Sequence, residues 1–364
     1  MGDLYSMFRG CLLGLAVGDA MGNTVDRQSL EEIRADYGPN GLLGYDLVNG
    51  CADVTSYTQL AAFSANGLLM GLTRGMLQGK LAPLVRYIGL ALREWSCSQH
   101  NRVPERIFCW LSYVPELKRR HCMDRWMLEI LSQPVLGTMD APTNRSDHPA
   151  ALTAVIPLAM LAPHLQIHPD ALDKMGAEAV ALTHGKPEAF LSGALLTHVL
   201  SRILQGEEGT ARQMAEEALE SVQDLFGSRY PRMSYLWELL QQALTLAESD
   251  LSPMDAMEKL GCRTAPEVLA GVVYACATCH GDFDTAMITA VNHSGRSAAV
   301  GAITGAVLGA AFGFEALPEF YLESLEPTQV LMELANDLVQ GCPMDIGSSL
   351  FDDEWDRKYL RAGQ

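Results

Sequence analysis

Glycine recurs at every fourth position in two apolar segments that lie near opposite ends of the 364-residue chain. Residues four apart return to nearly the same face of an α-helix, so each series predicts a helix with one bare stripe. Glycine costs about 1 kcal/mol of helix propensity relative to alanine, and the close approach of a second helix offsets that cost. We therefore predict that the two helices pack together at the centre of one domain. The glycines are Gly10, Gly14, Gly18 and Gly22 in the first segment and Gly301, Gly305, Gly309 and Gly313 in the second.

The rest of the chain has helical patterns and no convincing two-residue alternation of a β-strand. Residues 170–205 predict two helices, residues 210–251 have an amphipathic pattern, and residues 81–131 also look helical. No low-complexity linker or change of composition divides the sequence. We predict an all-α protein with a single domain over residues 1–345 and a charged, frayed C-terminal tail over residues 346–364.

The acidic composition narrows the classes of partner. The formal net charge is −18 and the pI is about 4.8, which argues against a nucleic-acid partner. The apolar run 298–313 is shorter than the roughly 20 residues that a membrane span needs. Residues 1–9 lack the pattern of a signal peptide. We expect a cytoplasmic protein with no membrane or nucleic-acid partner.

Nine cysteines are scattered through apolar segments, which favours reduced thiols over a disulfide framework. Cys276, Cys279 and His280 form a C-x-x-C-H pattern, which is also the attachment pattern of c-type haem. Haem attachment requires export, and a zinc site would need a second close pair of ligands. The remaining interpretation is a helix end with two buried thiols.

Several motifs then point to one family. Asn292-His293-Ser294-Gly295 precedes the second glycine series, and Gly18-Asp19-Ala20-Met21-Gly22 ends the first. A Thr-His pair at Thr183 and His184 lies between two predicted helices. Together these segments, spread over nearly the whole chain, resemble the ADP-ribosylglycohydrolase family, which includes the dinitrogenase reductase-activating glycohydrolase. The resemblance implies a single-domain orthogonal helical bundle that hydrolyses the glycosidic bond to ADP-ribose with two magnesium ions.

The magnesium-binding aspartates of that family are replaced in this chain. The family motif N-H-S-G-D-S-D places two aspartates where this sequence has Arg296 and Ala298. The motif S/T-D-D-T-Q places two more where it has Ser56 and Tyr57. Magnesium prefers carboxylate and other oxygen ligands, so we predict that the metal is absent and that no cofactor is bound.

A central loop of the family is also altered. The segment that begins at Asn144 resembles N-x-S-x-G-C-G-G-x-M-R, whose glycines let the backbone approach the ligand. The family arginine corresponds to Ala154. The glycines and cysteine correspond to His148, Pro149, Ala150 and Ala151.

A few acidic and histidine side chains remain as candidates for catalysis. Asp26 stands where the family usually has a glutamate near the substrate, and Asp53 and His184 are the other candidates for general acid–base work. We expect Arg296 to take the place of the metal by pairing with Asp26 or Asp53. The predicted ligand-binding cleft consists of Asp19, Asp26, Ser56, Tyr57, Asn144, His148, His293, Ser294, Gly295 and Arg296.

Residues 281–285 read G-D-x-D-T and imitate the lost aspartate motif. They precede the N-H-S-G segment and are not followed by the glycine helix. We therefore interpret Asp282 or Asp284 as the N-cap of the helix that begins here and ends before Asn292.

Three functions fit these observations. The first is a pseudoenzyme with a binding or regulatory role, whose ligand is ADP-ribose, a related nucleotide or a protein partner. The second is an active hydrolase of ADP-ribosyl bonds with an unusual or metal-independent site. The third is a purely structural protein. The hydrolase requires clustered carboxylates in the central cleft, whereas the pseudoenzyme predicts a cleft blocked by Arg296 and Tyr57.

Overall fold

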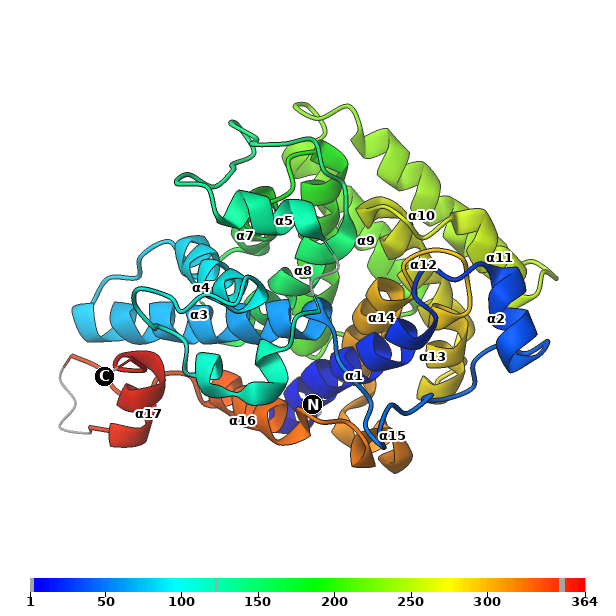
Figure 1. The fold of residues 1–364 in the computed structure, drawn as a ribbon. Coiled ribbons are helices and arrows are strands. Elements are labelled where there is room, and N and C mark those ends of the chain that lie inside the picture. Colours follow the sequence, from blue (N-terminus) through cyan, green and yellow to red (C-terminus); the bar gives the residue numbers. More distant parts are fainter. Residues whose placement is uncertain (1–2, 122–123, 166, 347–350, 364) are drawn as a thin grey trace.

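The computed structural model describes residues 3–121, 124–165, 167–346 and 351–363. Over these residues the chain is all helical, and its only β-pairings are isolated bridges. The predicted all-α fold is confirmed (Figure 1). The α-helices are α1 (Leu4–Val25), α2 (Leu30–Tyr37), α3 (Ser56–Gln78), α4 (Leu84–Gln99), α5 (Arg125–Leu131), α6 (Ile156–Met160), α7 (Pro169–Ala181), α8 (Pro187–Leu204), α9 (Ala211–Phe226), α10 (Met233–Ala247), α11 (Pro253–Leu260), α12 (Ala265–Thr278), α13 (Phe283–Val291), α14 (Ser297–Phe312), α15 (Glu319–Glu323), α16 (Thr328–Gln340) and α17 (Asp353–Tyr359). Short 3-10 helices are η1 (Trp110–Tyr113), η2 (Pro115–Lys118), η3 (Pro149–Val155), η4 (Ala162–His164) and η5 (Phe314–Ala316).

Helices α1 and α14 are the two glycine-striped segments, and they lie side by side in the middle of the molecule (Figure 1). They run antiparallel, with the backbone of Gly14 facing Gly305. A Cβ atom placed on Gly14 would lie 2.2 Å from the carbonyl oxygen of Gly305, far inside van der Waals contact. The prediction that the two helices pack together at the centre is confirmed.

The start of α3 is held by one buried carboxylate. Asp19, from α1, accepts hydrogen bonds from the backbone N–H and the hydroxyl of Thr55, at 2.8 and 2.6 Å. It also accepts hydrogen bonds from the backbone N–H and the hydroxyl of Thr58, at 3.0 and 2.6 Å. Burial raises the pKa of Asp19 to about 6, although the four hydrogen bonds act in the opposite direction. Asp19 therefore joins α1 to the N-terminus of α3.

The expectation of helix throughout residues 81–131 is wrong. Helix α4 ends at Gln99, and between it and α5 the described residues contain only η1 and η2. The buried carboxylate of Glu94 holds this connection by accepting hydrogen bonds from the N–H groups of Phe108 and Cys109, at 2.7 and 3.2 Å. A side chain on α4 thus provides the hydrogen bonds that an α-helix would have provided internally.

The expectation of a frayed C-terminal tail is also wrong where the structure describes it. Helix α17 packs on α3 and η1, and both Trp355 and Tyr359 are buried. The indole N–H of Trp355 donates to the hydroxyl of Thr73 at 2.8 Å, and the hydroxyl of Tyr359 donates to Asp337 at 2.5 Å. Two buried aromatic side chains outweigh the high charge of the segment.

Two further predictions concern α12 and α13. Asp282 caps α13 by accepting a hydrogen bond from the N–H of Thr285 at 3.2 Å, which confirms its interpretation as an N-cap. The cysteines that the structure describes are all free thiols. At the end of α12 Cys279 is buried but Cys276 is only partly buried, so the prediction of two buried thiols holds for Cys279 alone. None of the described helices is long and apolar enough to cross a membrane.

Candidate functional site

The Asn292–Gly295 turn is a rigid support for the residue that follows it. The side chain of Asn292 exchanges two hydrogen bonds with the backbone of Leu42, at 2.8 and 2.9 Å. The buried ring of His293 accepts from the N–H of Gly295 at 3.0 Å and donates from Nε2 to the carbonyl of Ala290 at 3.0 Å. Burial lowers the pKa of His293 to about 4, so this histidine is a neutral, structural group.

The same turn is locked to the loop before α12. A Cβ atom on Gly295 would lie 2.6 Å from the carbonyl oxygen of Cys262, so only glycine fits. That carbonyl accepts a hydrogen bond from the N–H of Arg296 at 2.7 Å. The hydroxyl of Ser294 accepts from the N–H of Leu30 at 2.8 Å. These contacts fix Arg296 as the residue that precedes α14.

The guanidinium of Arg296 is partly buried, and its Nη1 atom has no hydrogen-bond partner among the described residues. Its positive charge acts on three other side chains, lowering the pKa of Asp26, Tyr57 and His148. In each of these three the dominant influence is nevertheless burial, which favours the neutral form. We call Asp26, Tyr57, His148 and Arg296 the Arg296 cluster.

Asp26 ends α1 and faces the first turn of α14. Its Oδ1 atom accepts a hydrogen bond from the N–H of Ala298 at 3.3 Å, and its Oδ2 atom lies 3.3 Å from Nε of Arg27. The Oδ2 atom makes no aligned hydrogen bond. Burial raises the pKa of Asp26, against the bond from Ala298 and the charge of Arg296.

The expected ion pair of Arg296 with a leftover acid needs correction. Among the described residues, Arg296 makes no ion pair with Asp26, although its charge influences that carboxylate. Asp53 is oriented elsewhere, because it forms an ion pair with Arg119 and lies 3.6 Å from Nε2 of His121. Asp53 therefore belongs to a partly exposed charge network and not to the Arg296 cluster.

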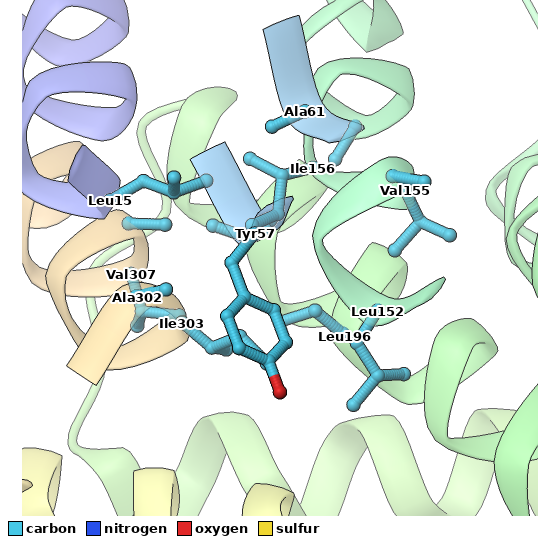
Figure 2. Close-up of a cluster of buried hydrophobic side chains, with 14 of the residues drawn as sticks. Leu15, Tyr57, Ala61, Leu152, Val155, Ile156, Leu196, Ala302, Ile303 and Val307 are labelled. Atoms are coloured by element: carbon cyan, nitrogen blue, oxygen red, sulfur yellow. The ribbon is translucent and has the colours of Figure 1, made fainter. Parts of the chain in front are cut away.

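Tyr57 fills the hydrophobic core. Figure 2 shows its side chain within a cluster of apolar side chains that includes Leu15, Ile156 and Ile303, from α1, α6 and α14. The ring is fully buried, and its hydroxyl has no hydrogen-bond partner in the described part of the chain. Burial raises the pKa of this hydroxyl well above 10, so it is a neutral hydrogen-bond donor.

His148 and His184 meet at Asp124, a residue that our sequence interpretation did not select. Nε2 of His184 lies 3.0 Å from Oδ2 of Asp124, and Nδ1 of His148 lies 3.8 Å from the same oxygen. The N–H of Ala150 donates to Nδ1 of His148 at 3.2 Å, which places the ring proton on Nε2. That Nε2–H group is buried and has no partner among the described residues.

Asn144 explains how two distant loops bring these histidines together. Its amide N–H donates to the carbonyl of Thr183 at 2.7 Å. Its carbonyl oxygen accepts from the N–H of Ser146 at 2.8 Å and from that of Gly185 at 3.1 Å. The side chain therefore connects the loop before His148 to the loop that carries His184.

The structure therefore separates the residues of the predicted cleft into two groups, those near Arg296 and those that bond to the backbone. Asp26, Tyr57 and His148 lie within the electrostatic influence of Arg296, and His148 and His184 share the carboxylate of Asp124. The remaining residues hold backbone or helix ends, except Ser56, which is buried at the start of α3. Asp124 caps α5 through the N–H of Trp126, and a helix-cap pattern was its only signal in the sequence. The residues that hold backbone are Asp19, Asn144, His293, Ser294 and Gly295.

The residues that the family resemblance places at the magnesium ligands do not fit a dinuclear magnesium site. Magnesium needs several oxygen ligands, chiefly carboxylates, in octahedral geometry. The four positions here provide a hydroxyl from Ser56, the core side chain of Tyr57, a guanidinium from Arg296 and a methyl group from Ala298. Asp19, the buried carboxylate that holds the start of α3, already accepts four hydrogen bonds.

Comparison with known proteins agrees with this architecture. An uncharacterized protein of Archaeoglobus fulgidus is 27% identical over 350 residues, covering 92% of this chain and 96% of that protein. A solved structure described as an ADP-ribosylglycohydrolase-related protein complex shares the fold, with a TM-score of 0.59 and 24% identity over 93% of this chain and 99% of the other. The sequence model of the ADP-ribosylglycohydrolase family matches residues 1–346. The chain therefore belongs to the ADP-ribosylglycohydrolase family.

Proposed function

We propose that this protein binds ADP-ribose or a related nucleotide at the Arg296 cluster without the dinuclear magnesium chemistry of its family, in a binding or regulatory role. The observation that carries this proposal is a set of four polar atoms that lack hydrogen bonds within the described structure. They are the hydroxyl of Tyr57, Nε2 of His148 and Nη1 of Arg296, together with Oδ2 of Asp26, which has only its ion pair with Arg27. Buried polar atoms are costly without partners, so a ligand that supplies them would be bound favourably.

The four groups match the functional groups of a nucleotide. A guanidinium binds phosphate oxygens through charge-assisted hydrogen bonds. A carboxylate such as that of Asp26 accepts hydrogen bonds from ribose hydroxyls. The hydroxyl of Tyr57 and the Nε2–H of His148 are neutral donors, as the burial-driven pKa shifts of both groups require.

Calorimetric titration with ADP-ribose tests the proposal, once in magnesium chloride and once in EDTA. Equal binding under both conditions is the expected result. Binding that requires magnesium would contradict it and restore a metal-dependent enzyme. The lack of binding under both conditions would also contradict it and direct the search to protein partners.

A second function is favoured by one observation, the buried carboxyl of Asp26. Its pKa is raised by burial, and a carboxyl group with a raised pKa can serve as a general acid or base. A metal-independent hydrolase would then release ADP-ribose from ADP-ribosylated arginine in the presence of EDTA. Chromatographic detection of that product, and its loss in an Asp26→Asn variant, would support this alternative over the pseudoenzyme.

A further inference from the structure

Asp124, His148 and His184 form a compact group of potential metal ligands. One ligating atom from each residue lies within 4.8 Å of the other two. Their side chains are only 4%, 14% and 0% exposed. The three residues come from separate segments: Asp124 precedes α5, His148 precedes η3 and His184 follows α7. In the described part of the chain, no other group of three such residues is as close.

The chemical types of these ligands select a particular class of metal ion. Two imidazoles and one carboxylate are typical ligands of zinc and other late first-row ions, with metal–ligand distances of about 2.0–2.2 Å. Magnesium prefers a shell made entirely of oxygen. The three ligands would leave the fourth position of a tetrahedral ion for solvent or for an oxygen of a bound ligand.

Outer hydrogen bonds already orient two of the three ligands. Nδ1 of His184 lies 2.8 Å from the hydroxyl of Thr183, on the side of the ring opposite Asp124. The Oδ1 atom of Asp124 accepts from the N–H of Trp126 at 3.0 Å, which leaves Oδ2 directed at the histidines. Such partners fix the orientation of a ligand and its tautomer in known metal sites.

The geometry points to a zinc site formed by Asp124, His148 and His184, separate from the lost magnesium positions. On zinc binding, the Nε2 proton of His184 moves to Nδ1 and is donated to the hydroxyl of Thr183, so the ring stays neutral and no net proton is released. His148 gives up its hydrogen bond from Ala150 and ligates through Nδ1. Its Nε2–H group remains available to the Arg296 cluster. This proposal does not depend on the proposed nucleotide binding.

Nearby charged side chains change the affinity of the site for zinc in opposite directions. Asp124 attracts the cation, whereas Arg296 and Arg27 already influence His148 as positive charges. At an effective dielectric constant of 20, one unit charge at about 10 Å interacts with a divalent ion by about 3 kcal/mol, and salt screens this interaction further, so tenfold is a lower bound for the change in affinity. We therefore expect an Arg296→Ala variant to bind zinc at least about tenfold more tightly.

The test uses full-length protein that has been treated with chelator and then dialysed. Titration with zinc chloride is expected to give one site, and titration with magnesium chloride under the same conditions is expected to give none. Cobalt(II) added to the same protein should give the absorption spectrum of a four- or five-coordinate ion without thiolate ligands. Asp124→Asn and His148→Gln are each expected to weaken zinc binding by at least about 100-fold.

Two controls separate this site from other zinc-binding groups. His198 and Asp173 form a buried pair with a 2.8 Å contact and no third ligand among the described residues, so His198→Gln should leave zinc binding unchanged. A Cys276→Ser/Cys279→Ser double variant should also bind zinc normally. Loss of the zinc site in the double variant, or unchanged affinity in both Asp124→Asn and His148→Gln, would overturn the proposal. Circular dichroism and thermal unfolding confirm that each variant is folded.

Discussion

The backbone of Gly18 faces that of Gly301 so closely that a Cβ atom on Gly18 would lie 1.9 Å from the carbonyl oxygen of Gly301. A Cβ atom on Gly301 would lie 2.3 Å from the carbonyl oxygen of Gly18. The contact is therefore reciprocal and involves backbone atoms on both helices. Backbone cannot relax by changing a rotamer, so the two helices would have to separate to admit a side chain.

A Gly18→Ala substitution is accordingly expected to lower the free energy of unfolding by about 3 kcal/mol or more, because overpacking at a helix contact displaces both helices. Urea denaturation followed by circular dichroism measures the change. Gly44→Ala is the matched control, since a Cβ atom there has nothing within 4 Å and is expected to change stability by less than about 0.5 kcal/mol. Similar losses in both variants would contradict the role of the α1–α14 contact.

Asp19 should make stability depend on pH. Its folded-state pKa is raised to about 6, above the unfolded value of about 4. Its contribution is therefore fully present below about pH 4 and is lost as the pH rises through 6. Relative to an Asp19→Asn variant, the wild type is expected to gain about 1 kcal/mol between pH 7 and pH 5. Urea denaturation at both pH values measures this, and a pH-independent difference between the two proteins would contradict it.

The hydroxyl of Tyr57 is predicted to serve a ligand and not the fold. Because it is buried without a partner among the described residues, Tyr57→Phe is expected to raise the free energy of unfolding by about 1 kcal/mol. The same variant should bind ADP-ribose about tenfold more weakly. Tyr359→Phe is the control of opposite sign, since that buried hydroxyl donates to Asp337 at 2.5 Å and its removal should destabilise the protein. Destabilisation by both variants would refute the prediction.

Removal of the Arg296 side chain is expected to weaken the binding of ADP-ribose and to strengthen the binding of zinc. Arg296→Ala should weaken ADP-ribose binding by at least about tenfold, since a charge-assisted hydrogen bond contributes about 1.5–3 kcal/mol. The same variant should strengthen zinc binding, as argued above. The free energy of unfolding should change by less than about 1 kcal/mol, because Nη1 has no hydrogen bond within the described residues. Arg229→Ala, at a mainly exposed ion pair with Asp140, should change neither affinity measured by calorimetry.

Asp53 is expected to have no part in catalysis or ligand binding. It lies in a partly exposed network with Arg119, and such pairs contribute about 1 kcal/mol or less. Asp53→Ala should therefore change ADP-ribose affinity and any hydrolytic rate by less than about twofold. Asp26→Ala, at the Arg296 cluster, should reduce both. If Asp53→Ala lost activity instead, the placement of the site at Asp26 would be wrong.

Local sequence patterns predicted much of the fold. The four-residue glycine period predicted the α1–α14 contact, because helix geometry alone places those residues on one face. Cap signals predicted the role of Asp282, since an N-cap acts within three residues. The tail was predicted incorrectly, because a composition rule for charged termini takes no account of Trp355 and Tyr359 packing on distant helices.

These local patterns predicted less well which residues make up the candidate site. Asp124 lies 60 residues from His184, and Asn144 joins the loop before His148 to the loop that carries His184. Asp53 was a candidate for general acid–base catalysis on sequence alone, whereas the structure pairs it with Arg119, 66 residues away.

The sequence by itself therefore determined the helical architecture and the family, because these depend on residue types at short, regular spacing. Only the tertiary structure decided which of the remaining polar side chains lie together and which hold backbone. Loops bring those side chains together, and the closure of a loop is governed by hydrogen bonds between distant segments that leave no periodic trace in the sequence.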